Sequence, residues 1–176
     1  QFQINFLSLS FRELIEAEKL RKSYDGKVIL DIPSLKIEKS QIVSICGPSG
    51  AGKTTLLSIL GTLMKADKIK ERSLKIMNED ITEMSSNYLS KFRNNHLGFI
   101  FQFHELLDDF DVIENIIIPG LIANKDKKLL LKKATEILKV LNINHLKFSN
   151  PKNISGGEKQ RVAVARSLIN SPSIIF

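Results

Sequence analysis

Apolar and polar positions alternate along residues 15–37, which indicates β-structure at the start of the chain. Asp25-Gly26 interrupts the alternation, and this dipeptide is typical of a two-residue hairpin turn. We therefore expect an antiparallel hairpin that joins residues 16–24 to a strand beginning at residue 27. The continuous apolar run 42–46 follows and predicts a buried central strand.

Strand and helix patterns alternate after residue 40, which is typical of an α/β protein with a parallel sheet. Apolar positions at helical spacing follow residue 53, and we assign the core-facing stripe of this helix to Leu56, Leu57, Leu60 and Leu63. Further along we expect a strand over 74–77, a polar helix over 85–94 and a buried strand over 97–101.

The most hydrophobic run of the chain, residues 112–122, contains Glu114, Asn115 and Pro119, so we expect a core or contact segment there. No stretch reaches the ~18 apolar residues of a membrane span. The start of the chain lacks the pattern of a signal peptide, and a cytosolic location is expected. Residues 127–141 predict an amphipathic helix with one apolar stripe and lysines elsewhere.

A glycine-rich loop between the expected central strand and the helix after it carries the first specific chemistry. It reads Gly47-Pro48-Ser49-Gly50-Ala51-Gly52-Lys53-Thr54. Gly50 and Gly52 can adopt positive φ and bring backbone amides close to phosphate oxygens. The helix start adds unpaired N–H groups and a positive dipole end. This spacing predicts that Lys53 reaches the β- and γ-phosphates of a nucleotide and that the Thr54 hydroxyl binds Mg²⁺.

A second pair of glycines opens the last predicted helix, residues 156–170. Ser155 is a natural N-cap, and Glu158 completes a capping box. Gly156 and Gly157 would each cost about 1 kcal/mol in a helix interior, so an ordinary cap does not explain them. With a hydroxyl, free amides and a dipole pointing outward, the segment predicts another anion site; an ordinary capped helix is the alternative.

The charge balance narrows the possible partners only a little. Lysine and arginine number 26 against 19 acidic residues, a net charge of +7. This suits nucleotides, anionic lipid or nucleic acid, although a solvated surface accounts for most lysines. The single cysteine, Cys46, excludes an internal disulfide and is expected to be buried in the central strand. The three histidines, His96, His104 and His145, have no ligand spacing, so no metal site made of side chains alone is expected.

Taken together, the two glycine segments resemble the phosphate loop and the signature of ATP-binding-cassette (ABC) ATPases, and the likeness covers residues 15–176. It implies a P-loop NTPase core with a parallel sheet, an N-terminal antiparallel β subdomain and an inserted helical subdomain at residues 103–157. It also implies that Tyr24 stacks on adenine and that Gln102 contacts the Mg²⁺ and γ-phosphate region. ATP would then be bound by Tyr24, the loop residues 47–54, Thr55 and the signature residues Ser155, Gly156, Gly157 and Glu158.

The resemblance also implies partners. Two copies would hold two ATP molecules head to tail, with each phosphate loop facing Ser155-Gly156-Gly157 of the other copy. Closure on ATP and reopening after hydrolysis would then drive transmembrane permease subunits.

A narrower likeness rests on Phe101-Gln102-Phe103-His104-Glu105-Leu106-Leu107 and on Leu60-Gly61-Thr62-Leu63. These segments are similar to the ATPases of bacterial lipoprotein-releasing systems, with macrolide-export ATPases as near neighbours. The likeness implies a protein on the cytoplasmic face of the inner membrane. The alternatives are a nucleic-acid- or ribosome-associated ATPase and a chain that binds nucleotide without hydrolysis. The single ordinary stretch from Thr54 to Ser155 lacks the long coiled coil of DNA-repair relatives, so nucleic acid is not expected.

Several departures from the family pattern bear on the structure. Ser40-Gln41 replaces the usual Gly-Glu, and residues 68–71 replace a glycine-containing turn, although non-glycine residues resist positive φ. Residues 1–14 form an extension that the family does not explain. The family's Walker B Asp and catalytic Glu are expected after Phe176, so residues 1–176 by themselves are expected to bind nucleotide without turnover.

Overall fold

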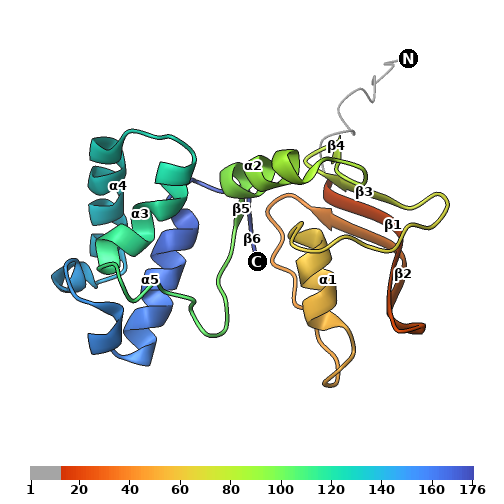
Figure 1. Cartoon of the computed structure of the whole chain (residues 1–176), viewed down its shortest axis with the longest axis horizontal. Coiled ribbons are helices and arrows are strands. Elements are labelled where there is room, and N and C mark those ends of the chain that lie inside the picture. The colour runs from red at the N-terminus through yellow and green to blue at the C-terminus, as the bar shows by residue number, and fades with distance from the viewer. Residues whose placement is uncertain (1–12) are drawn as a thin grey trace, which may run out of the picture. The chain divides into compact units, whose positions relative to one another are not determined.

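The computed structural model describes residues 13–176, which form two compact units (Figure 1). The first unit runs up to Leu89 and the second from Ser90 onward. Residues 1–12 of the predicted extension lie outside the described residues. Residues 13 and 14, the last two of the predicted extension, belong to the first strand. There Glu13 pairs with Glu38 and accepts a hydrogen bond of 2.7 Å from Lys36 Nζ.

The first unit is built on the predicted hairpin. Strand β1 (Glu13–Tyr24) pairs antiparallel with β2 (Lys27–Glu38). Asp25 and Gly26 adopt φ of 48° and 78°, the pair of positive values that a type I′ turn requires. The alternation of β1 buries Ile15 and Ala17, and Leu20 is buried after Lys19, where φ of 51° shifts the alternation by one residue. The hairpin prediction is therefore confirmed, and both strands are longer than the sequence pattern indicated.

Two shorter strands extend this sheet on the other side of β1. Strand β3 (Ser73–Ile76) pairs antiparallel with β1, and β4 (Glu79–Asp80) follows β3, so the order is β2-β1-β3-β4. The strand expected over 74–77 is thus confirmed, one residue earlier in the chain. Met77 and Asn78 adopt φ of 53° and 65° in the tight connection to β4.

The prediction of a central strand over residues 42–46 is wrong in this structure. The segment lies in no strand, Ile42 is fully exposed, and Cys46, which was expected to be buried, is exposed as well. A strand exists only through ladder hydrogen bonds to a neighbour, and none of the strands within residues 13–176 pairs with this segment. Without a neighbour, its apolar side chains stay uncovered.

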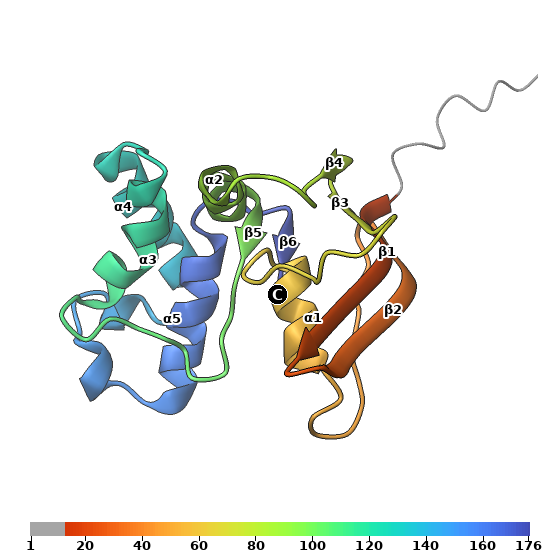
Figure 2. The ribbon, with the colours of Figure 1, turned by 45° about the vertical axis from the view of Figure 1, so that its right-hand side comes forward.

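Helix α1 (Lys53–Leu60) follows the glycine-rich loop and lies beside the β1–β2 hairpin (Figure 2). Leu56, Ile59 and Leu60 face the core. Leu57 and Leu63, expected on the buried stripe, are partly exposed. The helix ends at Leu60 because the chain turns at Gly61, so the helical spacing does not extend to position 63.

Helix α2 (Ser86–His96) spans the boundary between the units and confirms the predicted polar helix. In the second unit, β5 (Leu97–Gly98) and β6 (Ile174–Ile175) form a short parallel pair. The buried strand expected over 97–101 is therefore limited to its first two residues.

Three helices form the main core of the second unit: α3 (Val112–Ile122), α4 (Lys127–Val140) and α5 (Gly156–Leu168). Two 3-10 turns, η2 (Asn144–Leu146) and η3 (Pro151–Asn153), link α4 to α5. Their shared core includes Ile116, Ala134, Leu138 and Val162.

Several sequence predictions for these helices are confirmed. The run 112–122 is a core segment, the stripe of α4 is buried, and α5 begins with the predicted cap. In residues 13–176, no helix combines the length and the apolar character that crossing a membrane requires.

Candidate functional site

The glycine-rich loop after β2 takes the conformation that its glycines permit. Gly50 and Gly52 adopt φ of 78° and 81°, a left-handed backbone that L side chains disfavour. A Cβ on Gly52 would lie 2.7 Å from the carbonyl oxygen of Ile29 in β2, whereas a Cβ on Gly50 would meet nothing within 4 Å. Gly52 thus lets the loop pack closely on β2, and Gly50 leaves its outer side open.

Lys53 lies at the mouth of this loop. Its Nζ donates hydrogen bonds to the carbonyl oxygens of Gly47 at 2.8 Å and Pro48 at 2.7 Å. The ammonium is therefore held over the loop, next to the start of α1. An anion in the loop would meet both this cation and the positive end of the helix dipole.

The first turn of α1 is open to a ligand. Gly52, the N-cap, has no side chain with which to cap the helix, and no acidic residue lies in the first turn. Thr54 is exposed and Thr55 is partly buried. Backbone N–H groups of an uncapped helix start need acceptors, and phosphate oxygens are suitable ones.

Tyr24 ends β1 and presents an aromatic ring in the same unit. Its hydroxyl donates to Met64 Sδ at 3.0 Å, and the ammonium of Lys22 lies 5.4 Å from the ring centroid. The residue is 44% exposed, so part of the ring is free for stacking. The adenine role of Tyr24 stays a prediction.

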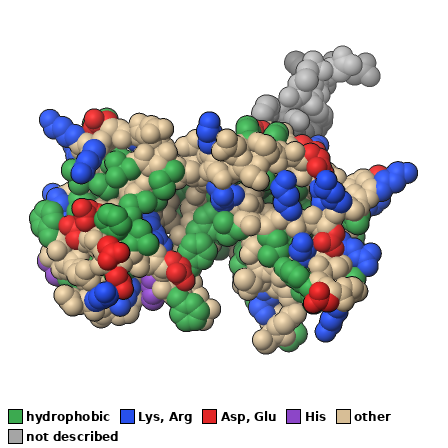
Figure 3. Space-filling view, viewed as in Figure 1, with side chains coloured by type: hydrophobic (Ala, Val, Ile, Leu, Met, Phe, Trp, Pro, Cys, Tyr) green, Lys and Arg blue, Asp and Glu red, His purple; other side chains and the backbone are tan. Residues whose placement is uncertain are grey.

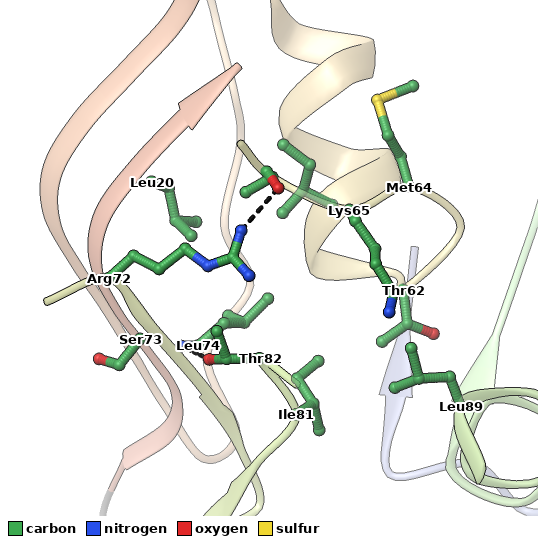
Figure 4. A pocket seen from close by; sticks show the side chains of 12 residues that line it. Leu20, Thr62, Met64, Lys65, Arg72, Ser73, Leu74, Ile81, Thr82 and Leu89 are labelled. Atoms are coloured by element: carbon green, nitrogen blue, oxygen red, sulfur yellow. Dashed lines mark hydrogen bonds between the residues drawn. The ribbon is translucent and has the colours of Figure 1, made fainter. Parts of the chain in front are cut away.

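Met64, which accepts the hydrogen bond from Tyr24, lies in the segment after α1, and Arg72 binds the same segment; no sequence motif pointed to either residue. The Arg72 side chain is only 6% exposed and lines a pocket between the sheet and α1 (Figure 4). Its Nη1 donates to the carbonyl oxygens of Ala66 at 2.7 Å and Asp67 at 2.6 Å, and its Nη2 donates to Glu83 Oε1 at 2.7 Å. No local sequence pattern marks such contacts, because they join residues that the fold brings together.

In the second unit, the start of α5 forms the predicted capping box. Glu158 N donates to Ser155 Oγ at 3.4 Å, and Ser155 N donates to Glu158 Oε2 at 2.7 Å. The Ser155 hydroxyl also donates to this carboxylate, at 2.8 Å. These hydrogen bonds from Ser155, aided by the positive charges of His145 and Arg161, hold the pKa of Glu158 below its usual value.

The two glycines beside this cap face open space. A Cβ on Gly156 or on Gly157 would meet no atom within 4 Å. Packing inside the chain therefore does not require glycine at either position. Glycine at these two positions would instead allow close approach of a ligand or a second chain.

Gln102 lies in the exposed connection between β5 and α3, also in the second unit. Asn115, 0% exposed, anchors the far end of this connection: its Oδ1 accepts from Leu107 N at 2.7 Å. Its Nδ2 donates to the carbonyl oxygens of Leu107, Phe110 and Asp111 at 2.9–3.2 Å. Tyr24 and residues 47–55 belong to the first unit, and Gln102 and residues 155–158 belong to the second.

Comparison with known proteins identifies related sequences over nearly the whole chain. A family model described as ABC transporter matches residues 30–176. The lipoprotein-releasing system ATP-binding protein LolD of Porphyromonas gingivalis is 48% identical over 93% of this chain and 73% of its own length. LolD of Cytophaga hutchinsonii is 43% identical over 94% and 74%. The bacitracin export ATP-binding protein BceA of Halalkalibacterium halodurans is 41% identical over 93% and 65%.

A solved structure supports the same relation. The dimeric post-hydrolysis state of the ATP-binding cassette MJ0796, bound to ADP and Pi, matches with a TM-score of 0.81 and 32% identity. The match covers 92% of this chain and 72% of that protein. It confirms the predicted fold class, an α/β P-loop core with an antiparallel β subdomain and helices.

Proposed function

The chain belongs to the ABC transporter family, and we propose that it is the ATP-binding, ATP-hydrolysing subunit of a system that releases lipoproteins from the bacterial inner membrane. The observation that carries the ATP site is the open loop in which Gly50 and Gly52 take left-handed φ under the ammonium of Lys53. The choice of lipoprotein as cargo follows the similarity to the LolD proteins.

In this proposal the loop and α1 bind the triphosphate of ATP. Backbone amides of residues 47–54 and the helix dipole accept the negative charge, and Lys53 supplies a cation that favours the β- and γ-phosphates. Tyr24 stacks on the adenine ring. Thr55, next to Thr54 on the first turn of α1, lies against the same phosphates.

Mg²⁺ fits the donor set of this site. We propose that the neutral oxygens of Thr54 and Gln102 and the phosphates would hold the ion; within residues 13–176, no three His, Cys, Asp or Glu side chains gather as metal ligands. Such hard oxygen donors suit Mg²⁺, which neutralises phosphate charge when bound.

Ser155, Gly156 and Gly157 are proposed to serve the ATP bound to a second copy of the chain. Their open side and capped helix start can receive the γ-phosphate, and Glu158 holds the Ser155 hydroxyl in place. The dimer would be head to tail. Gln102 would contact both the γ-phosphate region and a transmembrane permease, on the cytoplasmic face of the membrane.

The face shown in Figure 3 gives no support to the alternative of nucleic-acid binding. On the face shown in Figure 3, lysine and arginine side chains are scattered and mixed with acidic ones. Nucleic-acid-binding proteins gather their cations into a patch or stripe that follows phosphates.

The first experiment measures Mg²⁺-ATP affinity of the Lys53→Ala variant by calorimetry. Loss of a charge-assisted contact worth about 1.5–3 kcal/mol should weaken binding by roughly 10- to 150-fold. Lys128→Ala, on an exposed position of α4, is the matched control and should bind as the wild type does. Unchanged affinity of Lys53→Ala would remove Lys53 from the site.

The second experiment tests the role of α5 with Gly157→Asp in the full-length protein. The new carboxylate should leave monomer affinity for ATP nearly intact but repel the partner's γ-phosphate, at a cost of about 1 kcal/mol even in water and more in a dry interface. Sedimentation with ATP under non-hydrolysing conditions should show monomers for Gly157→Asp and dimers for the control Asn95→Asp. Normal dimerisation of Gly157→Asp would show that the start of α5 is only an ordinary capped helix.

The cargo is tested by reconstitution with permease subunits in vesicles. ATP should release a bound lipoprotein from the wild-type complex and not from Lys53→Ala. Bacitracin export in place of lipoprotein release would overturn the cargo assignment while leaving the ATP site intact.

A further inference from the structure

The connection that carries Gln102 has an unfavourable backbone in its middle. His104 and Glu105 adopt φ of 64° and 47°, left-handed values that non-glycine residues avoid. Two such residues in succession persist only where surrounding groups hold them. Gln102 lies two residues before them and is exposed.

Arg166, in the last turn of α5, holds these two residues. Its Nη2 donates to the carbonyl oxygen of His104 at 2.5 Å, and its Nη1 donates to the carbonyl oxygen of Glu105. The planar guanidinium offers two parallel donors to two successive carbonyls, which a lysine ammonium cannot do. The side chain is partly buried, and this burial lowers the pKa of Arg166, with Glu105 opposing the shift.

Helix α5 thus carries a group of interest at each end. It begins at the Ser155 cap with its two open glycines and reaches the Gln102 connection through Arg166. Asn115 of α3 fixes the far end of the same connection, near Leu107. The segment that contains Gln102 is therefore held by β5 on its N-terminal side and by Arg166 on its C-terminal side.

We infer that Arg166 is a positioning residue. From helix α5, which begins at the Ser155 cap, it holds the backbone that follows Gln102. The inference rests on the proposed ATPase function, because it assigns Gln102 a role at the γ-phosphate. Displacement of α5 by a ligand at Ser155 would be passed to Gln102 through the two guanidinium hydrogen bonds. Removal of the guanidinium should then impair turnover through Gln102 while nucleotide binding in the other unit persists.

A double-mutant cycle on the full-length protein with its permease tests this role. Steady-state ATPase rates are measured for wild type, Arg166→Gln, Gln102→Ala and the double variant. We expect Arg166→Gln to lower kcat about tenfold, with KM for ATP within about twofold, because the interaction acts in turnover and not in binding. In the Gln102→Ala background, the same change should alter kcat by less than about twofold, since coupled residues are not additive.

Two further variants separate positioning from folding. Arg166→Lys keeps the positive charge but loses the fork, so it should also show the lowered kcat while its melting temperature stays close to that of the wild type. Arg21→Gln, at an exposed position of β1, is the matched control, and kcat should be unchanged.

The outcomes distinguish this inference from the proposed function. Equal factors for Arg166→Gln in both backgrounds, or full activity of Arg166→Lys, would overturn the positioning role and leave the ATPase assignment standing. If Gln102→Ala left kcat unchanged, the role proposed for Gln102 would fail, and this inference with it.

Discussion

Replacement of Gly52 by alanine tests the reason for glycine in the loop with a control two residues away. At φ of 81°, an alanine costs about 1–2 kcal/mol in backbone strain. Its Cβ would also lie 2.7 Å from the carbonyl oxygen of Ile29, and overpacking against a fixed backbone costs roughly 1–3 kcal/mol. Gly52→Ala should therefore lose about 2–5 kcal/mol before the unfolded state is considered.

Gly50→Ala separates the two contributions. Gly50 has nearly the same φ, 78°, but its Cβ would meet no atom within 4 Å, so only the strain of about 1–2 kcal/mol applies. Both changes restrict the unfolded chain equally, by about 0.4–1 kcal/mol in favour of the native state, and this cancels in the comparison. The expected difference between the two variants is thus about 1–3 kcal/mol, the cost of the contact with Ile29.

Tyrosine fluorescence during urea unfolding measures this difference. The chain has no tryptophan and two tyrosines, Tyr24 and Tyr88, both in the unit that contains Gly52. The signal therefore follows that unit. Equal destabilisation by Gly52→Ala and Gly50→Ala would show that the close approach of the loop to β2 is absent.

The backbone at Ser40, the buried Asn115 side chain and the Glu158 carboxylate give three further predictions. Ser40→Gly should raise the free energy of unfolding by about 0.5–1 kcal/mol in urea titrations. It removes left-handed strain at φ of 67°, and this gain exceeds the entropy that glycine adds to the unfolded state. A loss of stability would show that the backbone at Ser40 is not strained. Asn115→Ala should lower the free energy of unfolding by roughly 2–4 kcal/mol, followed by circular dichroism, since backbone groups of residues 107–111 lose the hydrogen bonds of this fully buried side chain; a loss no larger than that of the exposed control Asn95→Ala would contradict this. Glu158 has a lowered pKa in the folded state, so its contribution to the α5 cap is present at neutral pH and is lost as pH falls through that lowered value. The Ser155 amide signal in NMR should titrate on the acid side of the usual glutamate range and should not titrate in Glu158→Gln.

The helix starts and the hairpin turn were predictable because the deciding interactions are local in the chain. Asp25-Gly26 supplies positive φ at two adjacent positions, and the hairpin forms there. Ser155 and Glu158 are three residues apart and bond each other at a helix start. The stripe of α4 follows from helical spacing alone, with Leu130, Ala134 and Leu138 buried.

Predictions that needed a neighbour were less reliable. The apolar run 42–46 has the composition of a buried strand, but composition does not provide the partner strand that the ladder requires. The same reason accounts for exposed Cys46. Leu63 matches the helical spacing of α1, yet the chain leaves the helix at Gly61.

The sequence by itself predicted a phosphate-binding loop and a capping box beside two glycines, and it indicated the family to which the chain belongs. Only the tertiary structure decided how those segments are held. Arg166 reaches carbonyl oxygens about sixty positions earlier in the chain, and Tyr24 bonds Met64 forty positions later. Backbone carbonyls are present at every residue and carry no sequence signal, so the arginine that will bind a particular pair is fixed only when the packed helices and turns bring them together.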